Sequence, residues 1–184
     1  MTNNLFASLA RRRVTWLVLA AGAVVVAVVL PLFQPWKLWV DETVDEPPPA
    51  AAAAASGTAS AGPRAAAGPA TIARGTFESH EHDTTGAVRV VRDSDGARYL
   101  RIEDLDTSNG PALKVWLTDA PVLTGRDGWH VFDDGRHVDL GALKGNKGSQ
   151  NYPIPAGVDL AAYRSVSIWC ARFRVSFGAA PLTN

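Results

Sequence analysis

Two different hydrophobic patterns divide the chain. Residues 14–33 carry no charge and consist mainly of Val, Leu and Ala. A helix over this range would be roughly 30 Å long, which matches the hydrocarbon core of a bilayer. From Ile72 onward, short runs of alternating apolar and polar residues are each ended by Gly, Asp, Asn or Pro. Alternation with a period of two is typical of β-strands. The pattern therefore predicts one membrane-spanning helix followed by a β domain.

The β domain is expected to contain about eight short strands. Their ranges are 75–80, 87–92, 98–105, 113–117, 137–140, 149–154, 165–170 and 173–177. Turn-forming sequences such as Asp95-Gly96 and Asp134-Gly135 separate them. Closely spaced strands without helical periodicity between them predict an all-β fold, either an antiparallel β-sandwich or a small barrel. The aromatic residues of this region recur mostly at strand spacing and are expected in the core.

The run SVSIWCARFRVSF near the end of the chain predicts two adjacent strands that share a core. Val166, Ile168 and Cys170 alternate and should point to one face, with Trp169 on the other. The phase must then change before Phe173, which indicates a turn between the two strands.

Charges beside the apolar segment predict its orientation. Arg11, Arg12 and Arg13 precede it, and acidic residues follow from Asp41. The positive-inside rule then places residues 1–13 in the cytoplasm and everything after residue 33 outside the cell membrane, as a single-pass protein in contact with the lipid bilayer through residues 14–33. A cleaved signal peptide is the alternative, but its apolar core is usually shorter and ends in small residues, whereas this one continues as PLFQPWKLWV. We favour the retained anchor.

Residues 34–71 are expected to form an extracytoplasmic linker rich in Ala and Pro. Pro47, Pro48 and Pro49 favour an extended polyproline segment, and the Ala-rich stretch that follows offers little to bury. The predicted organisation is a cytoplasmic N-terminus (1–13), a transmembrane helix (14–33), the linker (34–71) and one β domain (72–182).

Composition excludes several classes of function. The chain has 18 basic and 18 acidic residues, so no basic face for nucleic acid is expected. The single cysteine, Cys170, excludes a disulfide within the chain and a multi-cysteine zinc site. The sequence contains no Gly-x-Ser-x-Gly elbow, no His-Glu-x-x-His helix and no phosphate-binding glycine loop, which argues against hydrolases and nucleotide enzymes.

Cys170 and two histidines are the candidate functional residues. An unpaired thiol outside the cytoplasm is exposed to oxidation unless it is buried or used. Cys170 is therefore either a small core residue or a thiolate that binds a metal or passes electrons. His80 and His82 lie two apart, so on a strand they would face the same side and could share a metal ion with a third ligand. The alternative for both is a polar strand face near a turn. His130 and His137 are expected to face solvent in a hairpin.

Four segments between Ile72 and Leu182 carry a family resemblance. They read GTFESHEHDTTGAVRVV, YLRIEDLDTSNGPALKVWLT, VDLGALKGNKGSQNYPIP and YRSVSIWCARFRVSFGAAPL. In this order they resemble the DM-13 family, an electron transfer domain also found beside DOMON domains and in Skeletor-type matrix proteins. The resemblance implies a sandwich-like extracellular or periplasmic domain with a redox role, with the family's cysteine at Cys170 and its His-x-x-x-Gly histidine at His82. Ala112 departs from the family, which more often has an acidic residue there.

Two hypotheses follow. In the first, the outer domain takes part in electron transfer or thiol/metal redox chemistry through Cys170 with a redox partner. His82 is the candidate second contributor, as a ligand to a metal ion or as a neighbour of the thiol. In the second, the domain is a binding module without chemistry that holds a protein or another cell-surface partner. Burial of Cys170 is the observation that separates them.

Overall fold

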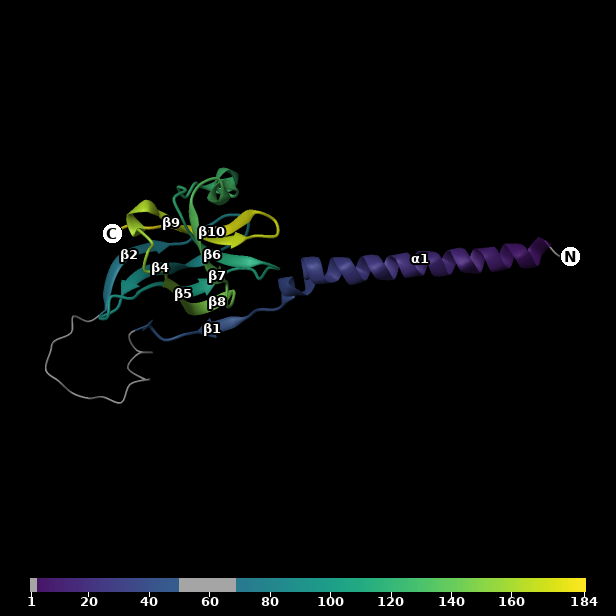
Figure 1. The fold of residues 1–184 in the computed structure, drawn as a ribbon, viewed down its shortest axis with the longest axis horizontal. Coiled ribbons are helices and arrows are strands. Elements are labelled where there is room, and N and C mark those ends of the chain that lie inside the picture. Colours follow the sequence, from purple (N-terminus) through teal and green to yellow (C-terminus); the bar gives the residue numbers. More distant parts are fainter. Residues whose placement is uncertain (1–2, 50–68) are drawn as a thin grey trace. The chain divides into compact units, whose positions relative to one another are not determined.

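A computed structural model describes residues 3–49 and 69–184, and Figure 1 shows its course. The chain divides into two compact units, Met1–Trp36 and Lys37–Asn184. The predicted linker residues 50–68 and the first two residues of the predicted cytoplasmic segment lie outside the described residues.

The first unit is built on one helix, α1 (Asn3–Phe33). Its stretch Arg12–Phe33 is long and apolar enough to cross a bilayer. Side chains such as Val18 and Val24 are more than half exposed. A helix that is apolar on all sides needs an apolar surrounding to cover it. The predicted helix over 14–33 is thus present, and it begins earlier than expected, at Asn3.

The second unit contains two five-stranded sheets. Sheet A has the order β1-β8-β5-β4-β2 and sheet B the order β3-β10-β9-β6-β7. The strands are β1 (Thr43–Asp45), β2 (Ala70–Thr76), β3 (Glu78–Ser79), β4 (Thr85–Arg92), β5 (Arg98–Asp106), β6 (Leu113–Thr118), β7 (His137–Ala142), β8 (Lys147–Ile154), β9 (Ser165–Cys170) and β10 (Val175–Pro181). Short 3-10 helices are η1 (Pro35–Trp39), η2 (Gly125–Gly128), η3 (Val131–Asp133) and η4 (Leu160–Ala162).

The mostly β fold of this unit is confirmed, as two sheets rather than a closed barrel over the described ranges. All eight expected strands are present, although the first is divided at Phe77 into β2 and β3. All described pairings are antiparallel except that of β1 with β8.

The main core fills the space between the two sheets. Val166, Ile168 and Cys170 of β9 point into it together, as their alternation predicts, and each is fully buried. Sheet A contributes residues such as Leu100 and Ile102. Burying side chains of this size contributes about 1.5–3 kcal/mol each, so this core is the main source of stability.

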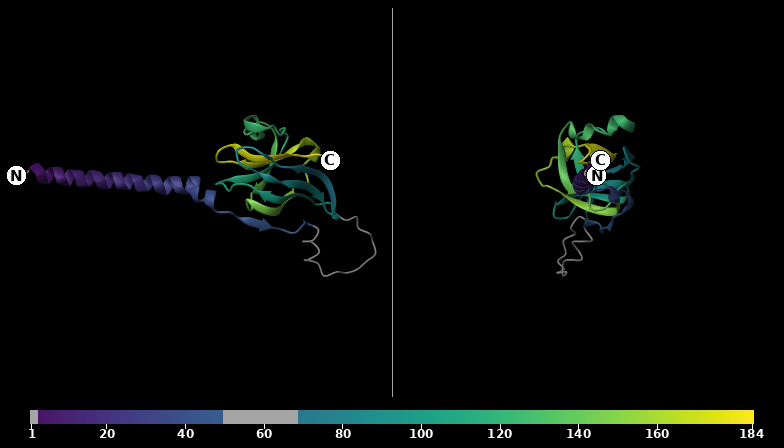
Figure 2. Two further views of the ribbon diagram at one scale, coloured as in Figure 1. Left: turned by 180° about the vertical axis from the view of Figure 1, so that it is seen from behind. Right: turned by 90° about the vertical axis from the view of Figure 1, so that its right-hand side faces the viewer.

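A second, smaller core lies on the other face of sheet B. Trp169 packs there against Trp116 and Phe132, with Ala120 and Ala179 beside them. The segment 119–136, which contains η2 and η3, covers this face. In Figures 1 and 2 its short green helices lie beyond β9 and β10, away from sheet A. As a result every residue of β9 is buried.

Phe173 differs from expectation because it lies in a turn rather than in the core. Residues 171–174 form the turn between β9 and β10, and Phe173 is 49% exposed. Arg174 has a φ of 52°, which lets the chain reverse before β10 begins at Val175. The phase change that the sequence predicted is this turn.

Part of the expected linker belongs to sheet A. Thr43–Asp45 pairs in parallel with Lys147–Ser149 of β8. Glu46 accepts hydrogen bonds from Lys144 Nζ and from the backbone N–H of Asn151, both at 2.7 Å. Burial works to raise the pKa of Glu46, but the hydrogen bonds from Lys144 and Asn151 outweigh it and lower this pKa. The chain is therefore fastened to the domain before the Pro-rich stretch begins.

Gly148 allows this parallel strand to approach. Its φ is +91°, and a Cβ on it would lie 2.1 Å from the carbonyl oxygen of Val44. At Gly157, in contrast, a Cβ would have no heavy atom within 4 Å, and the backbone lies outside the left-handed region.

We expect Gly148→Ala to destabilise the Lys37–Asn184 unit by about 2–3 kcal/mol, because the new side chain is strained and displaces β1. Gly157→Ala is the matched control and should change stability by less than about 1 kcal/mol. Urea unfolding of both variants measures the difference. Equal stability of the two variants would show that β1 does not contribute to the folded domain.

Candidate functional site

Cys170 is the last residue of β9 and is completely buried in the main core. It lies opposite Leu113 of β6 and Val175 of β10 in the two neighbouring ladders. No hydrogen bond to its sulfur is formed by any described residue. The thiol is therefore surrounded by apolar side chains, as expected for a cysteine that packs like a small hydrophobic residue.

The position of Cys170 along its strand nevertheless brings it close to the surface. Its carbonyl oxygen accepts a hydrogen bond of 2.8 Å from the N–H of Arg174, which closes the turn. All four turn residues, 171–174, are exposed. Cys170 is thus the residue directly before a solvent-exposed turn. Opening the end of this hairpin is therefore the shortest way to expose its thiol.

His82 lies over the main core from outside. Its ring is half-buried and packs on Phe177, with ring centroids 3.9 Å apart. Its Nε2 is 2.5 Å from a carboxylate oxygen of Glu81. Phe177 belongs to the same apolar core as Cys170. His82 is therefore a neighbour of the core that holds the thiol, and Glu81 orients it.

His80 differs from the expected polar strand face because it is buried. The chain bends over residues 80–82 instead of continuing as a strand. The His80 ring stacks on Phe132 of the second core, with centroids 5.6 Å apart, whereas His82 packs on Phe177 of the main core. The two histidines therefore contact different cores and do not share a face.

Both ring nitrogens of His80 have partners. Nε2 lies 3.1 Å from the carbonyl oxygen of Leu123, which can only accept, so Nε2 carries the proton and donates it. Nδ1 must then accept from the hydroxyl of Ser176 at 2.9 Å. Ser176 in turn contacts Ser167 Oγ at 3.0 Å. In this arrangement His80 has no free lone pair for a metal, and it links β10 to the segment 119–136.

The pKa of His80 is lowered. Burial is the largest cause, because it disfavours the charged imidazolium, while the Leu123 carbonyl and the charge of Glu78 partly offset it. The neutral form is therefore the one that the fold accommodates.

The other candidate ligands do not gather around a metal position. No group of three or more His, Cys, Asp or Glu side chains suited to a metal ion occurs in the described part of the chain. His130 and His137 are exposed, as expected for hairpin residues. His137 stacks on Trp116 at 3.9 Å, and His130 Nδ1 contacts the Arg174 carbonyl at 2.7 Å.

The serines around His80 are functional-site residues that sequence reasoning missed. Ser165 and Ser167 alternate with apolar residues in β9, a pattern typical of a strand with one solvated face. Both are fully buried because the segment 119–136 covers them, and Ser165 donates to the Ala120 carbonyl at 2.7 Å. A row of small hydroxyl side chains, rather than charged ones, is the only local signal for such a covered face.

Comparison with known proteins places most of the β domain in one family. Residues 76–182 match the family model described as "Electron transfer DM13". No curated protein and no solved structure matches the chain.

The burial of His80 predicts a pH-dependent stability. Its folded pKa lies below the ordinary histidine value of 6.5, so the unfolded chain takes up a proton first as the pH falls. Stability from this residue should be complete above pH 6.5, decrease as the pH falls from 6.5 to the folded pKa, and be constant below it.

Urea unfolding of the Lys37–Asn184 unit between pH 7.5 and 5, with His80→Gln and the exposed His130→Gln as variants, tests this. The difference in unfolding free energy between the unchanged domain and His80→Gln should shrink toward acid pH, and that for His130→Gln should stay nearly constant. A difference for His80→Gln that does not vary with pH would contradict a buried neutral histidine.

Proposed function

The chain belongs to the electron transfer DM13 family, and from this membership we propose that it is a membrane-anchored extracytoplasmic domain that transfers electrons through the thiol of Cys170. The family match over residues 76–182 is the observation that carries the proposal. Cys170 and Met1 are the two sulfur-containing side chains of the sequence, and Cys170 is its only thiol. A thiol can form a disulfide, whereas the thioether of Met1 cannot.

The proposed location is supported by α1 and its flanking charges. The apolar stretch Arg12–Phe33 follows three consecutive arginines, whereas acidic residues begin at Asp41. With the N-terminus in the cytoplasm, residues 14–33 would contact the lipid bilayer and the β domain would lie outside. In that compartment thiols meet oxidants and disulfide-bearing proteins.

The proposed chemistry is thiol–disulfide exchange with a partner protein. One cysteine cannot form a disulfide within the chain, so its oxidation must produce a bond to another molecule. The Cys170 thiol loses its proton to solvent, and its sulfur attacks a disulfide of the partner. A mixed disulfide forms while the partner's other sulfur leaves as a thiolate. A thiol of a second molecule, the electron donor, then attacks the Cys170 sulfur of the mixed disulfide, and the partner leaves with both of its cysteines reduced. The donor's other thiol attacks the new mixed disulfide, which releases Cys170 as a thiolate and leaves the donor as a disulfide, so two electrons pass from the donor to the partner.

This chemistry requires Cys170 to become accessible. The thiol is buried in the described conformation, but it adjoins the exposed turn 171–174. Opening of a hairpin end costs less than global unfolding, because few contacts are lost. We therefore propose that fraying at Cys170 and Val175 controls its reactivity. His82, beside Phe177, is the proposed second contributor to the electrostatic surroundings of the exposed thiol.

A metal held by His82 and Cys170 is less well supported than thiol exchange. Metal sites in proteins generally use three or four protein ligands. The described residues offer no group of three, so no step of the proposal depends on a metal.

The full burial of Cys170 favours the second candidate function, a binding module that holds an envelope protein or another cell-surface partner. In that case the cysteine is a packing residue of the core. The two functions differ in whether native Cys170 reacts.

Labelling of the full chain in lipid nanodiscs with a maleimide distinguishes them. For thiol exchange, we expect Cys170 to react roughly a hundredfold more slowly than in urea, through local opening. Val175→Ala, which trims its ladder partner, should speed labelling about tenfold by lowering the cost of opening by about 1.4 kcal/mol. Leu123→Ala, at an exposed side chain, should leave the rate unchanged.

Oxidised glutathione should give a mass increase of one glutathionyl group at a rate that follows labelling. The control variant is Cys170→Ala, because a serine hydroxyl at this apolar site would lack a partner. Labelling that occurs only at the rate of global unfolding would overturn the redox proposal and leave the binding module.

A further inference from the structure

A hollow opens at the end of the sandwich where β9 begins. It has a volume of about 550 Å³, within the range of small-molecule sites. Sheet A forms one wall through the ends of β2, β4 and β5, and the other wall consists of η4, residues 163–164 and Leu182. Leu182 is tied to this wall by a hydrogen bond of 2.7 Å from its N–H to the Arg164 carbonyl.

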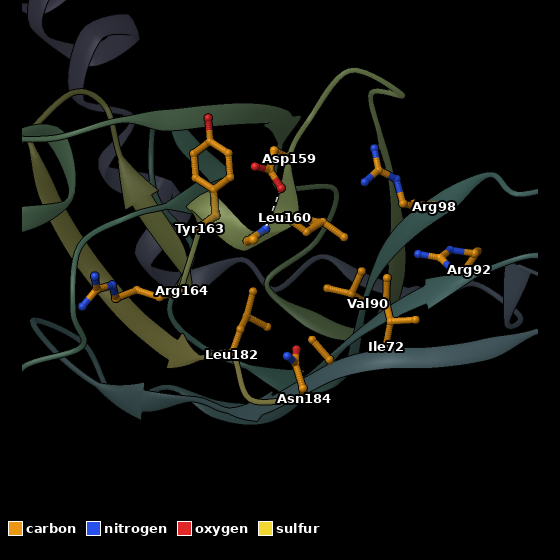
Figure 3. Close-up of a pocket in the computed structure, with 12 residues that line it drawn as sticks. Ile72, Val90, Arg92, Arg98, Asp159, Leu160, Tyr163, Arg164, Leu182 and Asn184 are labelled. Atoms are coloured by element: carbon orange, nitrogen blue, oxygen red, sulfur yellow. Dashed lines mark hydrogen bonds between the residues drawn. The ribbon is translucent and has the colours of Figure 1, made fainter.

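The floor of the hollow is an open end of the main core. Ile72, Leu160 and Leu182 are half-buried and pack against core residues on one side. Their other sides line the hollow together with Val90. Figure 3 shows Ile72, Val90 and Leu182 between Arg92 and Arg98 on one side and Arg164 on the other. The site thus has an apolar floor and three guanidinium groups at its rim.

Arg92 and Arg98 are placed against each other by the sheet itself. They are directly opposite in the ladder between β4 and β5. Side chains at such positions lie side by side, and two like charges there are destabilising. No carboxylate pairs with Arg92, Arg98 or Arg164 among the described residues. Arg98 instead donates to the carbonyl oxygens of Pro155 and Ala156, at 3.0 and 2.8 Å, which fix its position.

The same ladder contains a second arginine pair, and this pair is bonded to a carboxylate of the chain. Arg89 and Arg101 are also directly opposite, and the carboxylate of Glu103 bonds to both. Burial works to raise the pKa of Glu103, but the hydrogen bonds from the two arginines outweigh it and lower this pKa. One carboxylate therefore bonds both members of an arginine pair that is directly opposite in this ladder, whereas no carboxylate of the described residues bonds the pair at the hollow.

No side-chain carboxylate in the described part of the chain supplies that group. Asp159 lines the hollow, but its carboxylate accepts a hydrogen bond of 3.1 Å from the N–H of Ala161, where it caps η4. The sequence between residues 47 and 77 contains no Asp or Glu, so the segment that leads into β2 has no acidic side chain to offer.

We propose that the hollow binds a small organic carboxylate. Its carboxylate group lies between Arg92 and Arg98, as that of Glu103 lies between Arg89 and Arg101, and its apolar body covers Ile72, Leu160 and Leu182. Arg164 adds positive charge from the opposite wall. Guanidinium groups suit this role because they bond carboxylates through two donors at once.

This site is separate from the proposed redox thiol. Arg164 and Cys170 lie at opposite ends of β9, about 20 Å apart at the rise of an extended strand. Binding at the hollow does not rest on the proposed electron transfer, so Cys170→Ala should keep it.

The test is isothermal titration calorimetry of the full chain in phosphatidylcholine nanodiscs, with empty nanodiscs as the blank. The probes are 2-naphthoate, which has a carboxylate on an apolar body, and the neutral 2-naphthamide. Naphthoate should bind at least about tenfold more tightly than the amide. Arg92→Gln should weaken naphthoate binding by about tenfold or more, and Arg164→Gln by less. Arg172→Gln, in the exposed turn at the other end of β9, is the matched control and should have no effect.

A further variant, Arg92→Glu, places a carboxylate of the chain itself beside Arg98. It should abolish naphthoate binding and raise the melting temperature by about 1–4 °C, since it replaces a repulsive cross-strand pair with an attractive one. The higher melting temperature also shows that lost binding is not lost folding. Equal binding of naphthoate and naphthamide, or full binding by Arg92→Gln, would overturn the proposal.

Discussion

The burial of β9 on both faces is the constraint on which the rest of the domain depends. Its inner face joins the two sheets through Val166, Ile168 and Cys170. Its outer face carries Trp169 and two serines, none of which remains in water. A buried hydroxyl is costly unless it has a hydrogen-bond partner. Ser165 donates to the Ala120 carbonyl of the segment 119–136, and Ser167 is paired with Ser176. His80 joins Ser176 to the Leu123 carbonyl of the same segment, so the covering layer and the buried histidine belong to one hydrogen-bonded arrangement.

The sequence predicted those features that depend on local alternation. Eight strands, an all-β fold and the opposite faces of Cys170 and Trp169 all follow from a period of two, whereas the choice between a sandwich and a small barrel was left open. The prediction was incomplete where structure depends on distant partners. Thr43–Asp45 is too short to show a period, and its partner β8 lies about a hundred residues further along the chain. His80 was expected on a strand, but the chain bends there and its ring packs on Phe132, which belongs to the distant segment 119–136. Neither feature has a local signature.

For the candidate site, the sequence and the family resemblance singled out Cys170, and its phase with Ile168 already indicated the core. Its environment followed only from the assembly of both sheets. The sequence left open whether Cys170 is a core residue or a reactive thiolate. In the structure the thiol is buried, and Cys170 directly precedes an exposed turn. A thiol in this position is protected from random oxidation while the hairpin is closed. In the proposed function, its reactivity depends on the stability of one strand end rather than on a permanently open pocket.

The two ends of β9 differ in how completely the core is closed, and the difference is chemical. At the Cys170 end, apolar residues from three strands meet and leave the thiol no solvent-facing side. At the Arg164 end, the core meets arginines that cannot be buried without an anion, since an unpaired charge in an apolar surrounding is costly. The sandwich consequently stays open there. The Arg89–Arg101 pair shows what closes such a cluster, because Glu103 lies between its two guanidinium groups. Arg92 and Arg164 stand at the exposed rim of the hollow, so the proposed carboxylate reaches them from solvent while its apolar body covers the half-buried floor.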